Sequence, residues 1–296
     1  MVGRLDTAVE NAARAVAGRL TTTGAHLRGT AVRLEHADAE GALPFRHSDT
    51  QPVARRMVGG DLRSGQFVRF QADDVITVPL TDSRGNVIGV SFPSRRGDVG
   101  SKKRWARAKF MSSDHVHYAF WKEDPAAKKP KWVFGRRRPA PWADTDPVYA
   151  HAHADARTFH VSIKTGRWGS KPVQIDGATY AELLAANKHL AQALDTRPGP
   201  LVLLSCSPAR PGGSAAASMS GHLHSRTNID RDVYAAKGDV MTQTWRSREE
   251  VSSVGVEVDS SVGDAADSLW EVHRAPRDTP AGSDDQLPPP TVRNEL

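Results

Sequence analysis

The architecture of this chain follows from one apolar stretch, Leu201-Val-Leu-Leu-Ser-Cys206, whose first four residues are all large and hydrophobic. A short run of this kind, without polar alternation, is typical of a strand buried on both faces of a parallel sheet. Ser207, Pro208 and a glycine-containing loop follow at once, so Cys206 stands at the carboxyl end of the strand. Open parallel sheets place reactive groups at this edge.

Strands and helices alternate on both sides of that stretch. Period-two patterns bounded by turn residues predict strands over residues 66–70, 75–80, 87–92, 148–153, 159–163, 173–175 and 232–236. Apolar residues at helical spacing predict helices over residues 180–194 and 213–222. This order predicts an α/β domain over residues 65–260, built on a mostly parallel sheet with flanking helices.

The flanking segments have different patterns. Two series of residues repeat every seven positions: Val9, Val16, Thr23 and Thr30, and the apolar Ala13, Leu20, Leu27 and Leu34. This spacing predicts a long amphipathic α-helix over residues 1–42. Residues 43–64 are expected to form an irregular linker. We expect residues 261–296 to be a C-terminal extension, largely disordered from 276, where prolines and aspartates accumulate.

Composition excludes several classes of protein. The 296 residues contain a single cysteine, Cys206, so an internal disulfide and a Cys-rich zinc site are both excluded. The longest apolar runs fall far short of the roughly 20 residues that cross a bilayer. The N-terminus leads into no apolar core of a signal peptide. We therefore expect no membrane partner and no conventional export, and nothing in the sequence calls for a cofactor.

Positive charge is concentrated in one segment. Residues 95–138 contain 14 Lys and Arg against four Asp and Glu, a net +10 within a chain whose net charge is +6. Three interpretations of this basic segment stay open: a solvated surface, a nucleic-acid interface with stacking aromatics, and a polyanion site that regulates an enzyme. The candidate polyanion-binding residues are Lys102, Lys103, Arg104, Arg136, Arg137 and Arg138.

A histidine is placed like the cysteine. His153 ends the predicted strand 148–153, so the imidazole and the Cys206 thiol meet at one sheet edge if the two strands are neighbours. The imidazole could then lower the pKa of the thiol and later protonate the leaving group. The cysteine follows the histidine by 53 residues, close to the roughly 50 residues of caspase-type peptidases.

Three stretches carry a family resemblance: HADARTFHV (153–161), residues 173–184, and LVLLSCSPA (201–209). They resemble the "lonely Cys" domain of large actinobacterial proteins and polymorphic toxins, which is similar in plan to the caspase-like peptidases. The resemblance implies a caspase-like cysteine endopeptidase with Cys206 as nucleophile and His153 as general base. It also implies that the backbone N–H groups of Cys206 and Ala154 bind the oxyanion. Ala154 stands where the family has glycine.

The implied setting is the processing of a toxin or effector, by cleavage of a peptide, a linked toxin or the chain itself. Some toxin-processing domains that this chain resembles are activated by inositol hexakisphosphate, so the resemblance adds a polyanion activator to the alternatives for the basic segment. Residues 21–42 resemble the last helix of small type VII secretion substrates, although Leu34 stands where their export signal has tyrosine. That likeness implies a helical secretion partner, and secretion without a signal peptide or a cytoplasmic location before export.

Two other functions stay open. His151 and His153 occupy alternate positions of their strand and therefore share one face, a geometry suited to a divalent metal. The segment also resembles the HxHxDH motif of metallo-β-lactamase-like hydrolases, with Ala156 at the last histidine position. The His115/His117 and His222/His224 pairs could complete such a site. The third function is a catalytically degenerate binding module with a basic surface for a polyanion or a nucleic acid.

Overall fold

The computed structural model describes residues 56–122, 131–167, 169–246, 250–258 and 269–276, which form an α/β domain with mixed sheets. The long helix expected over residues 1–42 and the tail expected to be disordered lie outside the described residues. Among the helices that are described, none has both the length and the apolar character needed to cross a membrane.

The central sheet contains the predicted Leu201–Leu204 strand, β10. Its strand order is β3 (Val78–Thr81), β4 (Val87–Phe92), β7 (Val148–Ala154), β10, β11 (Val233–Ala236) and β14 (Trp270–His273). The four inner strands, β4, β7, β10 and β11, are parallel to one another. Every residue of β10 and β11 is buried, as expected for strands covered on both faces.

The sheet is less parallel than the sequence predicts. The antiparallel hairpin β3–β4 and the antiparallel strand β14 form its edges. The end of β7 also continues into an antiparallel branch of β8 (Phe159–Thr165), β9 (Gly169–Ile175), β1 (Met57–Asp61) and β2 (Phe67–Phe70). The predicted mostly parallel sheet is therefore corrected to a mixed one. Short turns connect β1 to β2, β3 to β4, β7 to β8 and β8 to β9, and such connections give antiparallel pairs.

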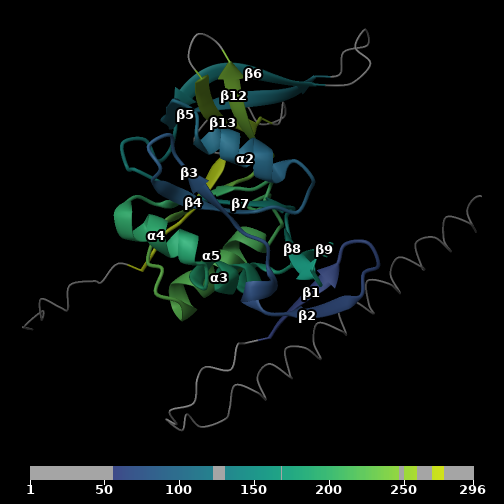
Figure 1. The fold of residues 1–296 in the computed structure, drawn as a ribbon. Helices are drawn as coiled ribbons and strands as arrows, with labels where there is room; N and C mark the ends of the chain where they lie inside the picture. The colour runs from purple at the N-terminus through teal and green to yellow at the C-terminus, as the bar shows by residue number, and fades with distance from the viewer. Residues whose placement is uncertain (1–55, 123–130, 168, 247–249, 259–268, 277–296) are drawn as a thin grey trace, which may run out of the picture. The chain divides into compact units, whose positions relative to one another are not determined.

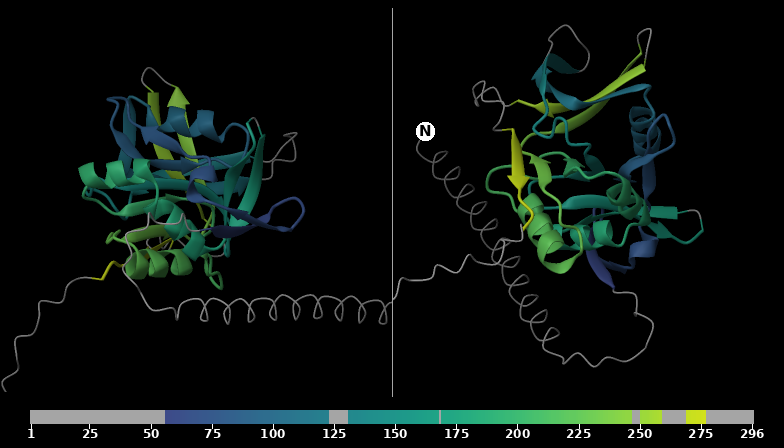
Figure 2. Two further views of the ribbon diagram at one scale, coloured as in Figure 1. Left: turned by 60° about the horizontal axis from the view of Figure 1, so that its bottom comes forward. Right: turned by 90° about the vertical axis from the view of Figure 1, so that its left-hand side faces the viewer.

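Three helices cover one face of the central sheet: α3 (Gly177–Ala185), α4 (Lys188–Thr196) and α5 (Ala215–Arg226). Figure 1 shows them together on one side, and Figure 2 shows the same layer from two further directions. The single helix expected over residues 180–194 is two helices. The Asn187 side chain accepts hydrogen bonds from the N–H groups of His189 and Leu190, and this cap starts a new helix.

The other face of the central sheet carries α2 (Asp98–Ala106) and a second sheet. That sheet has the order β12 (Val240–Arg246), β13 (Glu250–Glu257), β5 (Phe110–Lys122) and β6 (Lys131–Pro139). Trp105 of α2 is 1% exposed, packs edge-to-face on Tyr149 of β7 and donates through Nε1 to the Ser253 carbonyl oxygen. The basic segment is thus a helix and two paired strands, which lie above the central sheet in Figure 1.

The domain extends further at both ends than the predicted 65–260. Met57–Asp61 falls in the expected linker but forms β1, which pairs with β2 and β9. Trp270–His273 falls in the expected C-terminal extension but forms β14. Met57–Asp61 does not alternate between apolar and polar residues in sequence, and Trp270–His273 alternates over only four residues. Each is fixed by its partners, and Trp270 packs edge-to-face on Trp142.

Candidate functional site

The register of β7 and β10 brings the sequence-predicted pair to one edge of the sheet. Leu204 is paired with His151 in a parallel ladder. Cys206 lies two residues beyond Leu204 and His153 two residues beyond His151, so the cysteine and the histidine leave the ladder at the same level. Side chains at positions two apart share a face, which places both residues on the face that carries α2.

The N–H group of Ala154 points towards β10. The Val148 N–H donates to the Pro200 carbonyl oxygen at 2.9 Å, and N–H groups alternate sides along a strand, so the even-numbered residues of β7 face β10. The odd-numbered Asp155 agrees, because its N–H donates to the Thr158 carbonyl oxygen, within the β7–β8 hairpin on the opposite side.

Cys206 lies beyond the end of β10. The Leu201 N–H donates to the Asp232 carbonyl oxygen beside β11, and the Ser207 N–H donates to the Gly238 carbonyl oxygen in the β11–β12 loop. The ladder between β7 and β10 ends at Leu204, and within the described residues the Cys206 N–H reaches no backbone carbonyl oxygen. Ala154 and Cys206 thus both lie beyond the paired ends of two adjacent strands, His151 on β7 and Leu204 on β10.

An aspartate of α2 holds the imidazole of His153. Nε2 of His153 lies 3.2 Å from both carboxylate oxygens of Asp98, and the two side chains are 20% and 12% exposed. Oδ2 of Asp98 also accepts the N–H groups of Ser94 and Arg95, at 3.0 and 2.8 Å. Burial raises the pKa of Asp98, but the hydrogen bonds from His153 and Arg95 outweigh it and hold this pKa below its usual range. A carboxylate in this position fixes the proton on Nε2 and leaves Nδ1 to exchange one.

The second histidine of β7 is a buried neutral group. His151 is 2% exposed, and its Nδ1 is hydrogen-bonded to Ser91 Oγ at 2.8 Å. Its ring meets that of His153 edge-to-face, with 5.5 Å between centroids, so the two histidines do share one face as predicted. Burial, reinforced by the nearby Lys102 charge, lowers the pKa of His151 well below its usual value.

The thiol of Cys206 is protonated in this arrangement. It is half-buried, and Sγ donates to the Val240 carbonyl oxygen at 3.6 Å. Burial raises the pKa of the thiol and the carboxylate of Asp239 raises it further, whereas the hydrogen bond with the Val240 backbone and the charges of Lys102 and Arg95 oppose both effects. The structure thus brings Cys206 and His153 to the same edge but directs the thiol proton to β12, so attack on a substrate requires Sγ to rotate away from Val240.

The residue after the cysteine has a strained backbone. Ser207 has a φ of 53°, a left-handed conformation that non-glycine residues seldom adopt. Its N–H donates to the Gly238 carbonyl oxygen at 2.9 Å, and its Oγ donates to Asp239 Oδ1 at 2.8 Å. These bonds hold the sharp turn that carries the chain out of the sheet directly after Cys206. Such outliers cluster at functional sites, where the surroundings hold them in place.

The basic residues do not all face outward. Lys102 is half-buried and donates from Nζ to Thr242 Oγ1 of β12 at 2.7 Å. Burial lowers the pKa of Lys102 to about 8, and the charges of Asp98 and Cys206 oppose that effect. Among the other predicted polyanion-binding residues, Lys103, Arg104, Arg137 and Arg138 are exposed, and the side chain of Arg136 lies outside the described residues. Lys102 therefore belongs to the Cys206 and His153 site.

The histidine pairs proposed for a metal site do not converge with the β7 pair. His222 lies against Glu182 of α3, and His224 contacts the Arg231 carbonyl oxygen. Arg137 Nη2 donates to Nδ1 of His115 on β5. Over the described ranges, no three His, Cys, Asp or Glu side chains form a group that could hold a metal ion.

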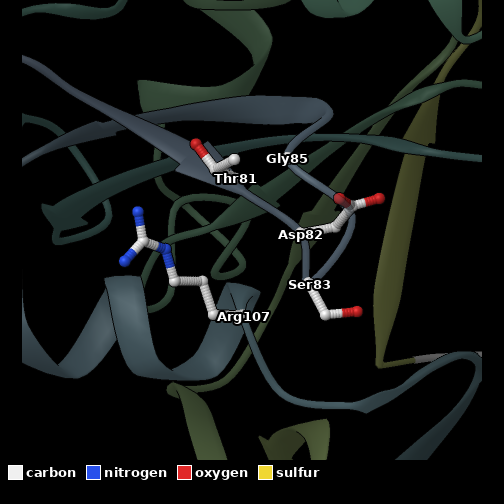
Figure 3. Close-up of a pocket in the computed structure, with 5 residues that line it drawn as sticks. All are labelled: Thr81, Asp82, Ser83, Gly85 and Arg107. Carbon is white, nitrogen blue, oxygen red and sulfur yellow. The ribbon is translucent and has the colours of Figure 1, made fainter.

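A surface cavity of about 360 Å³ lies at the other end of α2 from His153. It is lined by Thr81, Asp82, Ser83 and Gly85 of the β3–β4 turn and by Arg107, the residue that follows α2. Figure 3 shows the Arg107 guanidinium extending towards Thr81. This turn precedes β4, which is parallel to β7, so the cavity lies at the amino edge of the sheet, opposite the cysteine.

Sequence reasoning did not find Asp98 or Ser207. Asp98 was counted only as one of four acidic residues in a basic segment, although a carboxylate after Gly97 was a signal for a helix start. Nothing in the sequence indicates which histidine Asp98 would contact.

Comparisons with known proteins identify no relative of this chain. No protein-family model matches the chain, and neither the curated proteins nor the solved structures include a match.

Proposed function

We propose that the chain is a caspase-like cysteine endopeptidase in which Cys206 is the nucleophile, His153 the general base and Asp98 the residue that orients His153. One observation carries the proposal: β7 and β10 are adjacent and parallel, and the cysteine and histidine follow their paired ends by equal steps. The likeness of residues 153–161 and 201–209 to the "lonely Cys" domain supports the same assignment.

The proposed reaction begins with proton transfer. The raised pKa of Cys206 means that the thiol is neutral near pH 7, so Nδ1 of His153 takes its proton as Sγ attacks the peptide carbonyl carbon. The N–H groups of Ala154 and Cys206 donate to the oxyanion of the tetrahedral intermediate. His153 then protonates the leaving amine, and water hydrolyses the thioester, returning the thiol and releasing a carboxylic acid.

The orientation of His153 depends on Asp98. With Nε2–H directed at the carboxylate, the negative charge of Asp98 stabilises the imidazolium that forms during attack. The buried His151 ring meets this ring edge-to-face and is held by Ser91. These neighbours limit rotation of the ring, which keeps Nδ1 available to the thiol.

The substrate in this proposal is a peptide segment, either in another protein or in the chain itself. A processing role for a toxin or an exported effector rests on the family resemblance, as does activation by a polyanion. Export with a helical partner rests on the likeness of residues 21–42 to type VII secretion substrates.

The test compares wild-type protein with Cys206→Ala and His153→Gln during incubation, alone and with a diverse peptide mixture, by mass spectrometry. New peptide ends that form only with wild type are expected. A polyanion arm adds inositol hexakisphosphate. If wild type and Cys206→Ala give identical fragments in every arm, the peptidase proposal fails.

The neutral thiol favours a second candidate, a binding module that retains the sheet without the chemistry. The hydrogen bond from Sγ to the Val240 carbonyl oxygen is the observation behind it, because it uses the thiol proton structurally. Equal fragment patterns, together with iodoacetamide labelling of folded Cys206 more slowly than in the urea-unfolded chain, would support this candidate. The single cysteine makes whole-protein mass sufficient for that readout.

A further inference from the structure

We propose that helix α2 is the electrostatic partner of the cysteine and histidine, with Asp98 stabilising the imidazolium of His153 and Lys102 stabilising the thiolate of Cys206. This inference rests on the proposed function, and it assigns Lys102 a role as a positioning residue. Neither the basic segment nor the dyad indicated this role in sequence.

The spacing on α2 places both charges on one side of the helix. Asp98, Lys102 and Trp105 are separated by four and three residues, so they share the face that packs on the central sheet. Trp105 anchors that face through Tyr149 and the Ser253 carbonyl oxygen. In contrast, Lys103 and Arg104 are exposed. The position of Lys102 is therefore fixed by the packing of α2.

The strand β12 connects Lys102 to the thiol. Nζ of Lys102 donates to Thr242 Oγ1 at 2.7 Å, and Sγ of Cys206 donates to the Val240 carbonyl oxygen at 3.6 Å. Val240 and Thr242 are two residues apart on β12, which corresponds to about 7 Å along a strand. The ammonium and the sulfur therefore contact neighbouring positions of one strand.

The opposite charges favour the same proton transfer. Moving the proton from Cys206 to His153 creates a thiolate and an imidazolium. Asp98 lies against the group that becomes positive, and Lys102 lies near the group that becomes negative. An opposite charge within a few ångströms favours the charged form of a titratable group. The pair thus offsets part of the burial that keeps the thiol neutral.

Other charges face the same groups and belong in the comparison. Asp239, from the β11–β12 loop, opposes thiolate formation, and Arg95, from the segment before α2, favours it. His151 lies close enough to Asp98 and Lys102 for its pKa to respond to both. Among these groups, Lys102 is the cation carried by the same helix as the His153 partner.

The test measures the rate of iodoacetamide labelling of Cys206 from pH 5 to pH 10 in the full chain, by whole-protein mass. Lys102→Met is expected to move the inflection up by about half a pH unit and to slow labelling at pH 7 about threefold. Lys102→Arg should preserve the wild-type profile. The matched control is Lys103→Met, which removes an exposed charge from the adjacent position of α2 and should leave the profile unchanged.

Two further measurements keep the proposal falsifiable. Thr242→Val removes the acceptor of Lys102 and should shift the profile in the same direction as Lys102→Met. Asp98→Asn removes the carboxylate that lies against the imidazole, so it should also shift the labelling profile of Cys206, because the imidazolium that forms with the thiolate loses its counter-charge. Identical profiles for Lys102→Met and Lys103→Met would overturn the role of Lys102. Labelling does not require peptide cleavage, so this result is independent of whether the peptidase proposal fails.

Discussion

Gly213 controls the contact between α5 and the turn that follows His153, and replacing it with alanine should weaken the domain. A Cβ added at Gly213 would lie 2.3 Å from the Ala156 carbonyl oxygen and 2.8 Å from the Ala156 Cβ. The same carbonyl oxygen accepts the N–H groups of Ser214 and Ala215, at 2.7 and 3.1 Å. Relief of the overlap requires a displacement of roughly 1 Å, which lengthens both hydrogen bonds.

The expected cost follows from those contacts. Two hydrogen bonds at about 1 kcal/mol each, with part of the overpacking strain added, give a loss of about 2–3 kcal/mol in the free energy of unfolding. For a domain of this size each kcal/mol lowers Tm by about 2–4 °C, so a decrease of about 4–12 °C is expected for Gly213→Ala. Urea unfolding followed by tryptophan fluorescence measures the free energy, and differential scanning fluorimetry measures Tm.

The matched control is Gly221→Ala, in the middle of α5. A Cβ there meets no atom within 4 Å, and alanine is favoured over glycine in a helix interior by about 1 kcal/mol. This variant should therefore be as stable as wild type or slightly more stable. An unchanged urea midpoint for Gly213→Ala would refute the argument that the α5 contact sets the position of the turn after His153.

Three further predictions concern other parts of the fold. Gly89→Ala should lower the free energy of unfolding, measured by urea unfolding, by about 3 kcal/mol or more. The φ of Gly89 is +154°, and a Cβ added there would lie 1.9 Å from the Tyr149 carbonyl oxygen. Wild-type stability of this variant would contradict the β4–β7 pairing. The hydrogen bonds from Lys171 and the Arg63 N–H hold the pKa of Asp61 below its usual range, and burial opposes them only in part. Because the folded-state pKa of Asp61 is depressed, the stability that its ionised carboxylate contributes is present above the ordinary carboxyl pKa and is lost as pH falls. Urea midpoints from pH 6 to pH 3 should therefore decrease less for Asp61→Asn than for wild type. Parallel curves for the two proteins would contradict this prediction. Burial lowers the pKa of His151, so the unfolded chain binds a proton at this residue that the folded chain does not. The wild-type protein should therefore lose stability as pH falls below 6.5, the ordinary pKa of histidine. His151→Gln should flatten this dependence in urea midpoints from pH 8 to pH 5, and an unchanged slope would contradict the prediction.

Local sequence patterns were sufficient for much of the central sheet. The all-apolar run at Leu201–Leu204 predicted β10 because a strand buried on both faces has no polar positions. The strands β8 and β11 were also predicted close to their observed bounds, whereas β9, predicted over 173–175, begins earlier, at Gly169. These elements are defined by residues adjacent in sequence, so pattern reasoning reaches them.

Other elements are defined by partners far away in sequence. Met57–Asp61 became a strand through pairing with β9, more than 100 residues later. The contact of Asp98 with His153 depends on how α2 lies on the sheet, which no local pattern encodes. The positions of Cys206 and His153 at the ends of predicted strands were sufficient to place both at one sheet edge. The direction of the thiol proton instead depends on β12, a strand that the sequence analysis did not predict.

The hydrogen bonds of Ser207 to Gly238 and Asp239 have a consequence for when the site is complete during synthesis. The turn that carries Cys206 is held by residues more than 30 positions downstream, and the carbonyl oxygen of Val240 on β12 accepts a hydrogen bond from the thiol. A nascent chain that has emerged only as far as Arg226 therefore contains both reactive side chains without the segment that fixes the cysteine. A ribosome-bound chain should acquire its native thiol environment only after β12 has left the exit tunnel, so under the proposed function no cleavage precedes the synthesis of that strand.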